Sequence, residues 1–355
     1  MKFIAQINKL LPYFKKPSDI NSFDNILVVS NSGLGDTILS TPSIVSLRNS
    51  FPDINITFMV NKKIFPLFDG FEFVDSFVLY SSGFFSQLRI IKNLRKRKID
   101  TIFLFHSNGP EDIFFSVFSG AKNILKMTDN PNHKYKKIFI NSPNLTTKHD
   151  IEKKLDLVRL FNPDKLYKKM LIPKHFYSEN SYLKKDPGIK YIGIQLGAQD
   201  IYKMWPIEKF IDLIDIVNDR CPDLRFVLFG STKFEIMLSA QLLSVVNKPH
   251  TIVNICGQTD IDELPVAIND MDFIITGDTG TLHLAIALKK RTLSLFGPTD
   301  HKEYGPYQDM SSHSVIQVDG GFLNDVPKKK RGQEGMSLIG VDAVLRELEK
   351  AIGAR

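Results

Sequence analysis

The feature that most restricts the fold of this 355-residue chain is a repeated alternation of short apolar runs with helical segments. In the first half, strands are expected at residues 25–30, 54–60, 100–105 and 137–140, and helices at 36–49 and 84–97. The polar stretch between Pro173 and Pro187 indicates a linker. A strand followed by a helix, repeated in this way, is typical of parallel α/β units.

The alternation starts afresh after this linker. Strands are expected at residues 191–195, 225–229, 252–254, 273–276 and 292–296, and helices at 207–219, 233–246, 261–269, 281–288 and 341–352. We therefore predict an α/β fold with an N-terminal domain at 1–175, a C-terminal domain at 188–340 and a final helix at 341–355. Residues 1–24 form an amphipathic extension in this interpretation. Two such domains leave a cleft between the carboxyl ends of their sheets, where open parallel sheets bind ligands.

Composition narrows the class of protein further. Hydrophobic residues make up 43% of the chain and charged residues 24%, as in soluble globular proteins. The longest apolar run is far shorter than the roughly 20 residues of a membrane-spanning helix, and residues 1–16 lack the pattern of a signal peptide. Cys221 and Cys256 imply neither a disulfide framework nor a zinc cluster. We therefore expect a cytoplasmic protein.

The charge is distributed unevenly along the chain. Residues 1–175 contain 26 Lys and Arg against 15 Asp and Glu, whereas the remainder contains 20 against 24. A basic half suggests an anionic partner, which composition alone leaves as nucleic acid, a membrane surface or a phosphorylated acceptor.

The first candidate site follows the first predicted strand. Ser32, Gly33 and Gly35 form a turn in which the glycines permit backbone conformations closed to other residues. Asp36 then falls in the first turn of a helix, where its carboxylate could accept a proton from an attacking hydroxyl. The alternative is that Asp36 merely caps the helix.

The second candidate site is a loop that leads into a helix expected to start at Pro206. Lys203 lies in this loop, where its ammonium could neutralise a leaving diphosphate. The alternative for Lys203 is a solvated surface lysine, and the alternative for Trp205 is that it packs the loop against the helix.

The third candidate site is the turn from Gly277 to His283. It joins a buried strand to a helix whose first N–H groups suit a phosphate. Thr279 and Thr281 add hydroxyl donors, His283 could reach the same anion, and Asp278 would orient the loop or bind a sugar hydroxyl. The alternative is a capped helix with His283 in the core.

A metal site is not expected. Asp270-Met-Asp272 matches a metal-binding pattern of another fold, but it leads directly into a buried strand. We interpret the two carboxylates as a solvated pair at the start of that strand. The sequence has no zinc or calcium spacing elsewhere.

Five motifs in this order resemble the heptosyltransferase family, glycosyltransferase family 9. They are Gly33-Leu-Gly-Asp36 with Thr41-Pro42 behind it, Gly197-Ala198 with Lys203-Met-Trp205-Pro206, Gly257-Gln-Thr259, Asp278-Thr-Gly-Thr-Leu-His283 and Phe296-Gly-Pro-Thr-Asp300. The likeness runs from about Ile26 to Leu348. It implies the GT-B fold, in which two Rossmann-like domains face each other across a cleft.

The resemblance also implies roles for residues. The N-terminal domain would hold the acceptor beside Ser32, Gly33, Gly35 and the general base Asp36. The C-terminal domain would bind the donor through Gly197, Ala198, Lys203, Trp205, Gly230, Thr232, Glu235, Asp278, Thr279, Gly280 and His283. Family members invert the anomeric centre by direct displacement, with Lys203 and the turn at Thr279 stabilising the diphosphate. This implies heptose transfer from ADP-heptose to the lipopolysaccharide inner core or a related phosphorylated glycolipid, without a cofactor.

Two alternatives remain open at this stage. A relative of the family could use another nucleotide sugar, carrying a hexose or an N-acetylhexosamine, or the chain could be a non-catalytic sugar-nucleotide binder. Residues 84–98 and 3–16 combine apolar and basic side chains, which suits an anionic membrane surface at the inner face of the inner membrane. No nucleic-acid-binding module is recognisable. The role of the basic loop 328–331 is left undefined.

Overall fold

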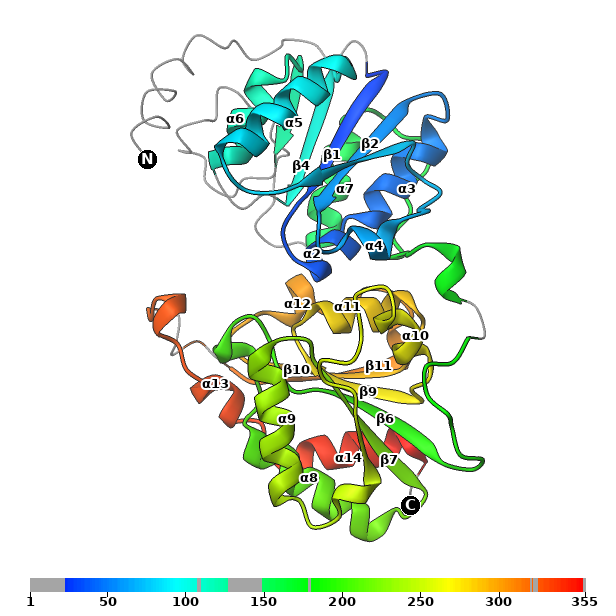
Figure 1. Ribbon diagram of the computed structural model, residues 1–355, viewed down its shortest axis with the longest axis vertical. Helices are drawn as coiled ribbons and strands as arrows, with labels where there is room; N and C mark the ends of the chain where they lie inside the picture. The colour runs from blue at the N-terminus through cyan, green and yellow to red at the C-terminus, as the bar shows by residue number, and fades with distance from the viewer. Residues whose placement is uncertain are drawn as a thin grey trace. The chain divides into compact units, whose positions relative to one another are not determined.

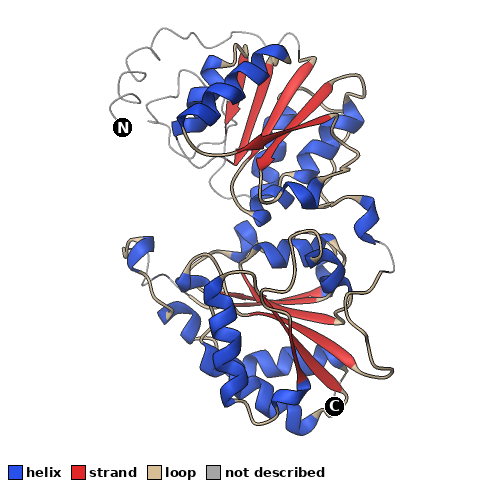
Figure 2. Cartoon of the chain, viewed as in Figure 1, coloured by secondary structure: helices blue, strands red, loops and turns tan. Residues whose placement is uncertain are grey.

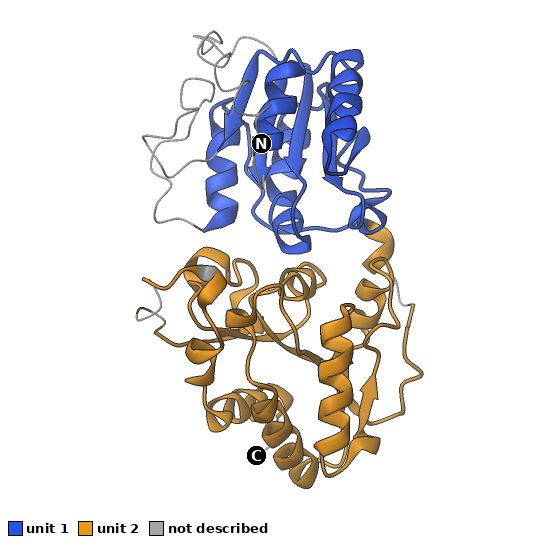
Figure 3. Cartoon of the chain, turned by 60° about the vertical axis from the view of Figure 1, so that its left-hand side comes forward, with its two compact units in different colours: residues 1–173 blue, residues 174–355 orange. Residues whose placement is uncertain are grey.

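The computed structural model describes residues 23–106, 110–126, 149–177, 180–319, 321 and 325–353. The chain divides into two compact units, residues 1–173 and 174–355 (Figure 3). Each unit is an α/β layer structure with its own parallel sheet (Figure 2). The strand expected at 137–140 and residues 1–22 of the expected extension lie outside the described residues.

The first unit is built on a five-stranded parallel sheet. Its strands are β1 (Asn25–Ser30), β2 (Asn55–Asn61), β3 (Ser76–Tyr80), β4 (Thr101–His106) and β5 (Asn123–Lys126). They lie in the order β3-β2-β1-β4-β5. β1 lies at the centre of the sheet. Because a central strand is covered on both faces, its five consecutive residues from Ile26 are buried.

Helices cover both faces of this sheet (Figure 1). They are α2 (Leu34–Ile38), α3 (Thr41–Ser50), α4 (Phe65–Phe68), α5 (Phe84–Lys96), α6 (Pro110–Phe118) and α7 (Asp150–Arg159). α3 packs against α7, and α5 packs against α6. Leu27 and Val29 of β1 belong to the cluster beneath α5 and α6, because alternate side chains of a strand point to the same face.

The second unit has a six-stranded parallel sheet in the order β11-β10-β9-β6-β7-β8. Its strands are β6 (Lys190–Gln195), β7 (Leu224–Phe229), β8 (Ile252–Asn254), β9 (Phe273–Gly277), β10 (Thr292–Phe296) and β11 (His313–Gln317). Counted within the unit, this is the strand order of a Rossmann fold, in which the first strand lies at the middle of the sheet.

The helices of the second unit pack in pairs. They are α8 (Ile207–Arg220), α9 (Lys233–Val245), α10 (Leu264–Asn269), α11 (Gly280–Ala287), α12 (His301–Tyr304), α13 (Glu334–Ser337) and α14 (Val341–Ile352). α8 contacts both α9 and α14, and α10 contacts α11. The apolar side chains of α8, α9 and α14 form one cluster with β6 and β7, which contains the sole tryptophan of the chain, Trp205.

Most predicted elements are present, but three details of the prediction are wrong. The helix expected at 36–49 is two helices, α2 and α3, separated at Leu39 and Ser40, because Pro42 starts a new helix. Pro206 is the N-cap residue of α8 and not its first helical residue. α10 begins at Leu264, three residues later than expected, with Pro265 in its first turn.

Candidate active site

The candidate residues lie where the order of strands reverses in each sheet. In the first unit the chain moves from β1 outward through β2 and β3, and then returns to add β4 on the other side of β1. In the second unit β6 and β9 are neighbours for the same reason. The loops that leave the carboxyl ends of two such neighbouring strands diverge and leave room for a ligand.

Asp36 follows β1 and is the third residue of α2. Its Oδ2 atom accepts a hydrogen bond from Ser32 Oγ at 2.7 Å and one from the Gly33 N–H at 3.4 Å. Among the described residues, no hydrogen bond or ion pair involves Asp36 Oδ1. The side chain is 28% exposed. One carboxylate oxygen is therefore anchored to the loop, while the other is available for a substrate.

The structure bears on two expectations about this loop. The N-cap of α2 is Gly33, and Asp36 takes part in capping as the third helical residue, because its carboxylate accepts the Gly33 N–H. Gly33 has a φ of −88°, and Gly35 is not among the glycines with positive φ, so neither backbone conformation requires glycine.

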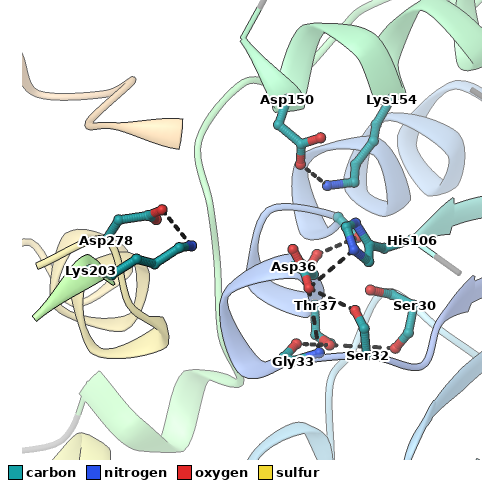
Figure 4. A network of polar contacts seen from close by, with 11 residues as sticks. Ser30, Ser32, Gly33, Asp36, Thr37, His106, Asp150, Lys154, Lys203 and Asp278 are labelled. Carbon is teal, nitrogen blue, oxygen red and sulfur yellow. Dashed lines mark hydrogen bonds and ion pairs between the residues drawn. The ribbon is translucent and has the colours of Figure 1, made fainter. Parts of the chain in front are cut away.

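His106 is a member of this site that the sequence analysis missed. It is the last residue of β4, and its Nε2 atom lies 3.3 Å from Asp36 Oδ2 (Figure 4). The pairing of β1 with β4 shifts by one residue at Val29 and Ser30, which brings His106 beside Ser30 at the end of the sheet. Burial lowers the pKa of His106 below its ordinary value of 6.5, Asp36 opposes this shift, and Lys154 adds to it.

A buried ion pair lies on the other side of His106. Lys154 and Asp150 are four residues apart on α7, and the Lys154 ammonium contacts the Asp150 carboxylate (Figure 4). Neither side chain is more than 6% exposed. Burial alone would raise the pKa of Asp150, but Lys154 outweighs this and lowers it. The pair therefore places a fixed positive and a fixed negative charge next to the imidazole.

In the second unit, the structure brings Lys203 and Asp278 together. Lys203 Nζ lies 2.7 Å from Asp278 Oδ2, and their side chains are 23% and 8% exposed (Figure 4). Lys203 ends a short 3₁₀ helix after β6, and Asp278 follows β9. Gly277 makes this approach possible, because a Cβ atom at Gly277 would lie only 2.7 Å from the Lys203 carbonyl oxygen. Lys203 is therefore not a free surface lysine.

The turn after Asp278 starts α11. Thr279 is its N-cap residue, but its hydroxyl pairs with the Thr276 hydroxyl at 2.9 Å and makes no side-chain cap. Gly280 is the first residue of α11, and His283 on the same helix is 3% exposed. The amide-rich start of this eight-residue helix lies beside the Lys203–Asp278 pair in sequence and in fold.

Glu235 holds three loops of the second unit together. Its Oε2 atom accepts bonds from the N–H groups of Ser231 and Thr232 at 2.9 Å and from the Thr232 hydroxyl at 2.8 Å. Its Oε1 atom accepts a bond from Gln195 Nε2 at 2.6 Å, and Gln195 Oε1 accepts one from the Thr281 hydroxyl. The carboxylate of Glu235 is thus committed to the protein.

Two glycines among the expected donor-binding residues make room for this carboxylate. A Cβ atom at Gly197 would lie 2.3 Å from Glu235 Cγ, and one at Gly230 would lie 2.6 Å from Glu235 Cβ. Ala198, next to Gly197, packs at the edge of the apolar cluster. These glycines are therefore explained by close packing around Glu235.

The structure favours the packing interpretation of Trp205. Its side chain is 3% exposed, and its indole N–H donates to the Ile339 carbonyl at 3.0 Å. Its ring meets Phe210 edge to face. Trp205 thus supports the Lys203 loop from the core.

Asp270 and Asp272 tie the segment around residue 181 to the second unit. Asp270 is 6% exposed and accepts bonds from Ser181 Oγ and from the N–H groups of Tyr182 and Leu183, so it is not a solvated residue as expected. Asp272 accepts a bond from the Tyr191 N–H. Within the described ranges, no group of three or more His, Cys, Asp or Glu residues is placed to hold a metal ion. In the same ranges, no helix has the length and apolarity to cross a membrane.

Comparison with known proteins identifies glycosyltransferase family 9. Residues 131–327, more than half of the chain, match the model of glycosyltransferase family 9 (heptosyltransferase). Lipopolysaccharide heptosyltransferase 3 of Escherichia coli strain K12 is 23% identical over 336 residues, which cover 90% of this chain and 95% of that protein.

Solved structures show the same fold. The structure of Escherichia coli ADP-heptose lipopolysaccharide heptosyltransferase II matches with a TM-score of 0.73 at 19% identity and covers 92% of this chain and 98% of that one. An Escherichia coli heptosyltransferase with ADP-2-deoxy-2-fluoro heptose matches with a TM-score of 0.66 at 15% identity, over 92% and 99% of the two chains. The fold is GT-B, with two Rossmann-like units.

Proposed function

This chain belongs to glycosyltransferase family 9, and we propose that it transfers heptose from ADP-heptose to the lipopolysaccharide inner core or a related phosphorylated glycolipid. The observation that carries the proposal is the match to proteins named lipopolysaccharide heptosyltransferases along 90% of the chain. The geometry at the two switch points supports it, because a partly exposed carboxylate lies at one and a lysine beside a helix start at the other.

We assign the acceptor to the first unit and the general base to Asp36. With Oδ2 held by Ser32 and Gly33, Oδ1 accepts the proton of the acceptor hydroxyl as that oxygen attacks the anomeric carbon. The new glycosidic bond forms as the bond from the sugar to the ADP oxygen breaks, and the anomeric centre is inverted.

We assign the donor to the second unit. The Lys203 ammonium and the first N–H groups of α11 neutralise the diphosphate as it leaves. The ion pair with Asp278 holds the Lys203 ammonium in place for the diphosphate. Asp278 then accepts a hydrogen bond from a sugar hydroxyl, because its carboxylate would repel a phosphate. Lysine supplies the positive charge for which other transferases use a metal ion, so we expect activity to persist in excess EDTA.

We also propose that the enzyme works at the cytoplasmic face of the inner membrane and contacts it through α5. Phe84, Phe85 and Leu88 on this helix are 50%, 77% and 43% exposed, whereas Gln87, Ile90, Ile91 and Leu94 are buried against the unit. Lys92, Arg95 and Lys96 are exposed along the same side of the helix. An apolar end bordered by cations suits an interface of anionic lipids.

Flotation of the full chain with phosphatidylglycerol vesicles tests the membrane contact. The wild type should float at low salt, and a Phe85→Ser, Leu88→Ser double variant should remain at the bottom. Phe234→Ser, at an exposed aromatic residue of the second unit that is 43% exposed, is the matched control and should float like the wild type. Equal flotation of the double variant and the wild type would refute a role for α5.

The donor is tested by calorimetric titration with ADP-heptose, an ADP-hexose and UDP-N-acetylglucosamine, together with mass detection of the product formed on inner-core acceptor. ADP-heptose should bind most tightly and yield a heptosylated product. Tighter binding and transfer of another sugar would identify the other family activity. Binding without any transfer would identify a non-catalytic sugar-nucleotide binder.

A further inference from the structure

The polar contacts around Asp36 converge on one of its two oxygens. Ser32 Oγ, the Gly33 N–H and His106 Nε2 all lie within 3.4 Å of Oδ2. Ser32 and Gly33 belong to the same loop as Asp36, so they cannot fix the loop against the sheet. His106 can, because it is the last residue of β4, the neighbour of β1.

We propose that His106 is a positioning residue for the transfer reaction. A neutral imidazole donates its Nε2–H to Asp36 Oδ2, which turns Oδ1 toward the acceptor hydroxyl without placing a positive charge beside the carboxylate. This inference rests on the proposed role of Asp36 as the base. It adds a residue from a different strand, which holds the base in its reactive orientation.

The surroundings of His106 favour the neutral form that this role needs. The charged groups that face it are Asp36, Asp150 and Lys154, with Lys126 from β5 further away. The negative and positive charges largely offset one another, and burial of the ring then disfavours an imidazolium ion. A protonated His106 would stabilise the carboxylate form of Asp36 and make it a weaker base.

Geometry also explains why a histidine suits this position. The Nε2 atom stands far enough from the backbone of β4 to reach Oδ2 at 3.3 Å. The side-chain amide nitrogen of glutamine reaches nearly as far from its backbone, whereas that of asparagine is one methylene shorter. Glutamine donates an N–H but does not titrate in the range of histidine. A glutamine at this position therefore keeps the hydrogen bond without the charge of a protonated histidine, whereas an asparagine keeps a polar group that is too short to form the bond.

Steady-state kinetics of the full chain with ADP-heptose and inner-core acceptor tests the proposal. His106→Ala should lower kcat about 10- to 100-fold, because a misplaced catalytic group loses rate on this scale. His106→Gln should restore kcat to within about threefold of the wild type, and His106→Asn should not. The Kd for ADP should be unchanged in all three, since the donor is assigned to the other unit.

The dependence of kcat/KM on pH gives a further test, because it would not change if His106 had only a structural role. In the wild type, kcat/KM should fall in a pH range that lies below the ordinary histidine pKa of 6.5, because burial lowers the pKa at which His106 gains a proton. In His106→Gln this fall should move to lower pH. A His106→Ala variant with wild-type kcat would refute the proposal, as would folded Gln and Ala variants with equal losses.

Failure of this inference can be told apart from failure of the proposed function. If Asp36→Asn is inactive and His106→Ala is fully active, Asp36 remains the base and only the positioning role is wrong. If Asp36→Asn keeps wild-type activity, the assignment of the base itself is wrong. Melting temperatures of all variants identify any that are unfolded, and His106→Gln then carries the test through its pH profile.

Discussion

Replacing Glu235 by alanine should lower the free energy of unfolding of the second unit, because the hydrogen bonds of its carboxylate are lost. The carboxylate accepts four hydrogen bonds, three of them at the start of α9 and one from the buried Gln195. Loss of the cap costs about 0.5–2 kcal/mol, and an amide of Gln195 left without its partner costs about 1–3 kcal/mol. We therefore expect a loss of about 1.5–5 kcal/mol in the free energy of unfolding.

Trp205 provides the assay. It is the only tryptophan of the chain and is 3% exposed in the core of the second unit, so its fluorescence reports the unfolding of that unit. For a unit of this size, each kcal/mol lowers the melting temperature by about 2–4 °C. The alanine variant should therefore melt about 3–20 °C below the wild type.

Glu235→Gln is the matched control. Its amide oxygen can accept from Ser231 and Thr232, and its NH₂ group can donate to Gln195 once the Gln195 amide turns over. Gln195 would then donate to the Thr281 hydroxyl, which can also accept a bond. The glutamine variant should thus lose less than half as much stability as the alanine variant. Equal losses in the two variants, or an alanine variant that melts with the wild type, would refute the network.

Three further changes have defined outcomes. Lys203→Met leaves Asp278, which is 8% exposed, without its cation. The free energy of unfolding, followed by Trp205 fluorescence, should fall by about 1–3 kcal/mol. ADP should bind at least tenfold more weakly by calorimetry, and unchanged ADP binding would contradict the donor site. Gly277→Ala places a Cβ atom 2.7 Å from the Lys203 carbonyl oxygen. It should therefore lower the free energy of unfolding by about 1–3 kcal/mol and weaken ADP binding. Unchanged stability and ADP affinity would show that the loop shifts freely. Burial lowers the pKa values of His106 and His313 in the folded protein. Below about pH 6.5 the unfolded chain therefore binds more protons than the folded chain, and the free energy of unfolding should decrease as the pH is lowered. Urea unfolding at pH 7.5 and 5.5 should show a smaller fall for His106→Gln, and equal falls would contradict the shift.

The sequence was sufficient for the elements with strong local signals. β8, β10 and α14 were predicted with the same bounds that the structure has, because apolar runs and a helical stripe mark them clearly. β3 and β11 were missed, and both are edge strands with mostly half-buried residues. In β3, residues 77–80 form an apolar run that could have indicated a strand. β5 has four residues and was also missed, although the three-residue β8 was predicted, so strand length does not explain the difference.

The candidate site was predictable only in part. The motifs located Asp36, Lys203 and Asp278, because glycine-rich turns and helix starts carry a local pattern. His106 has no such pattern: it matters because β4 lies next to β1, and the order of strands is a property of the sheet. The role of Glu235 did have a signal, since Thr232 and Glu235 have the spacing of a capping box.

If Asp36 is the base of the transfer reaction, its loss should slow transfer, while the donor, which is assigned to the other unit, should bind as before. The most direct test is single-turnover transfer from ADP-heptose by Asp36→Asn beside the wild type, with the ADP affinity measured on the same samples. Asp36→Asn should transfer heptose about 10²- to 10⁴-fold more slowly than the wild type at unchanged ADP affinity. A variant that transfers heptose at the wild-type rate would contradict it.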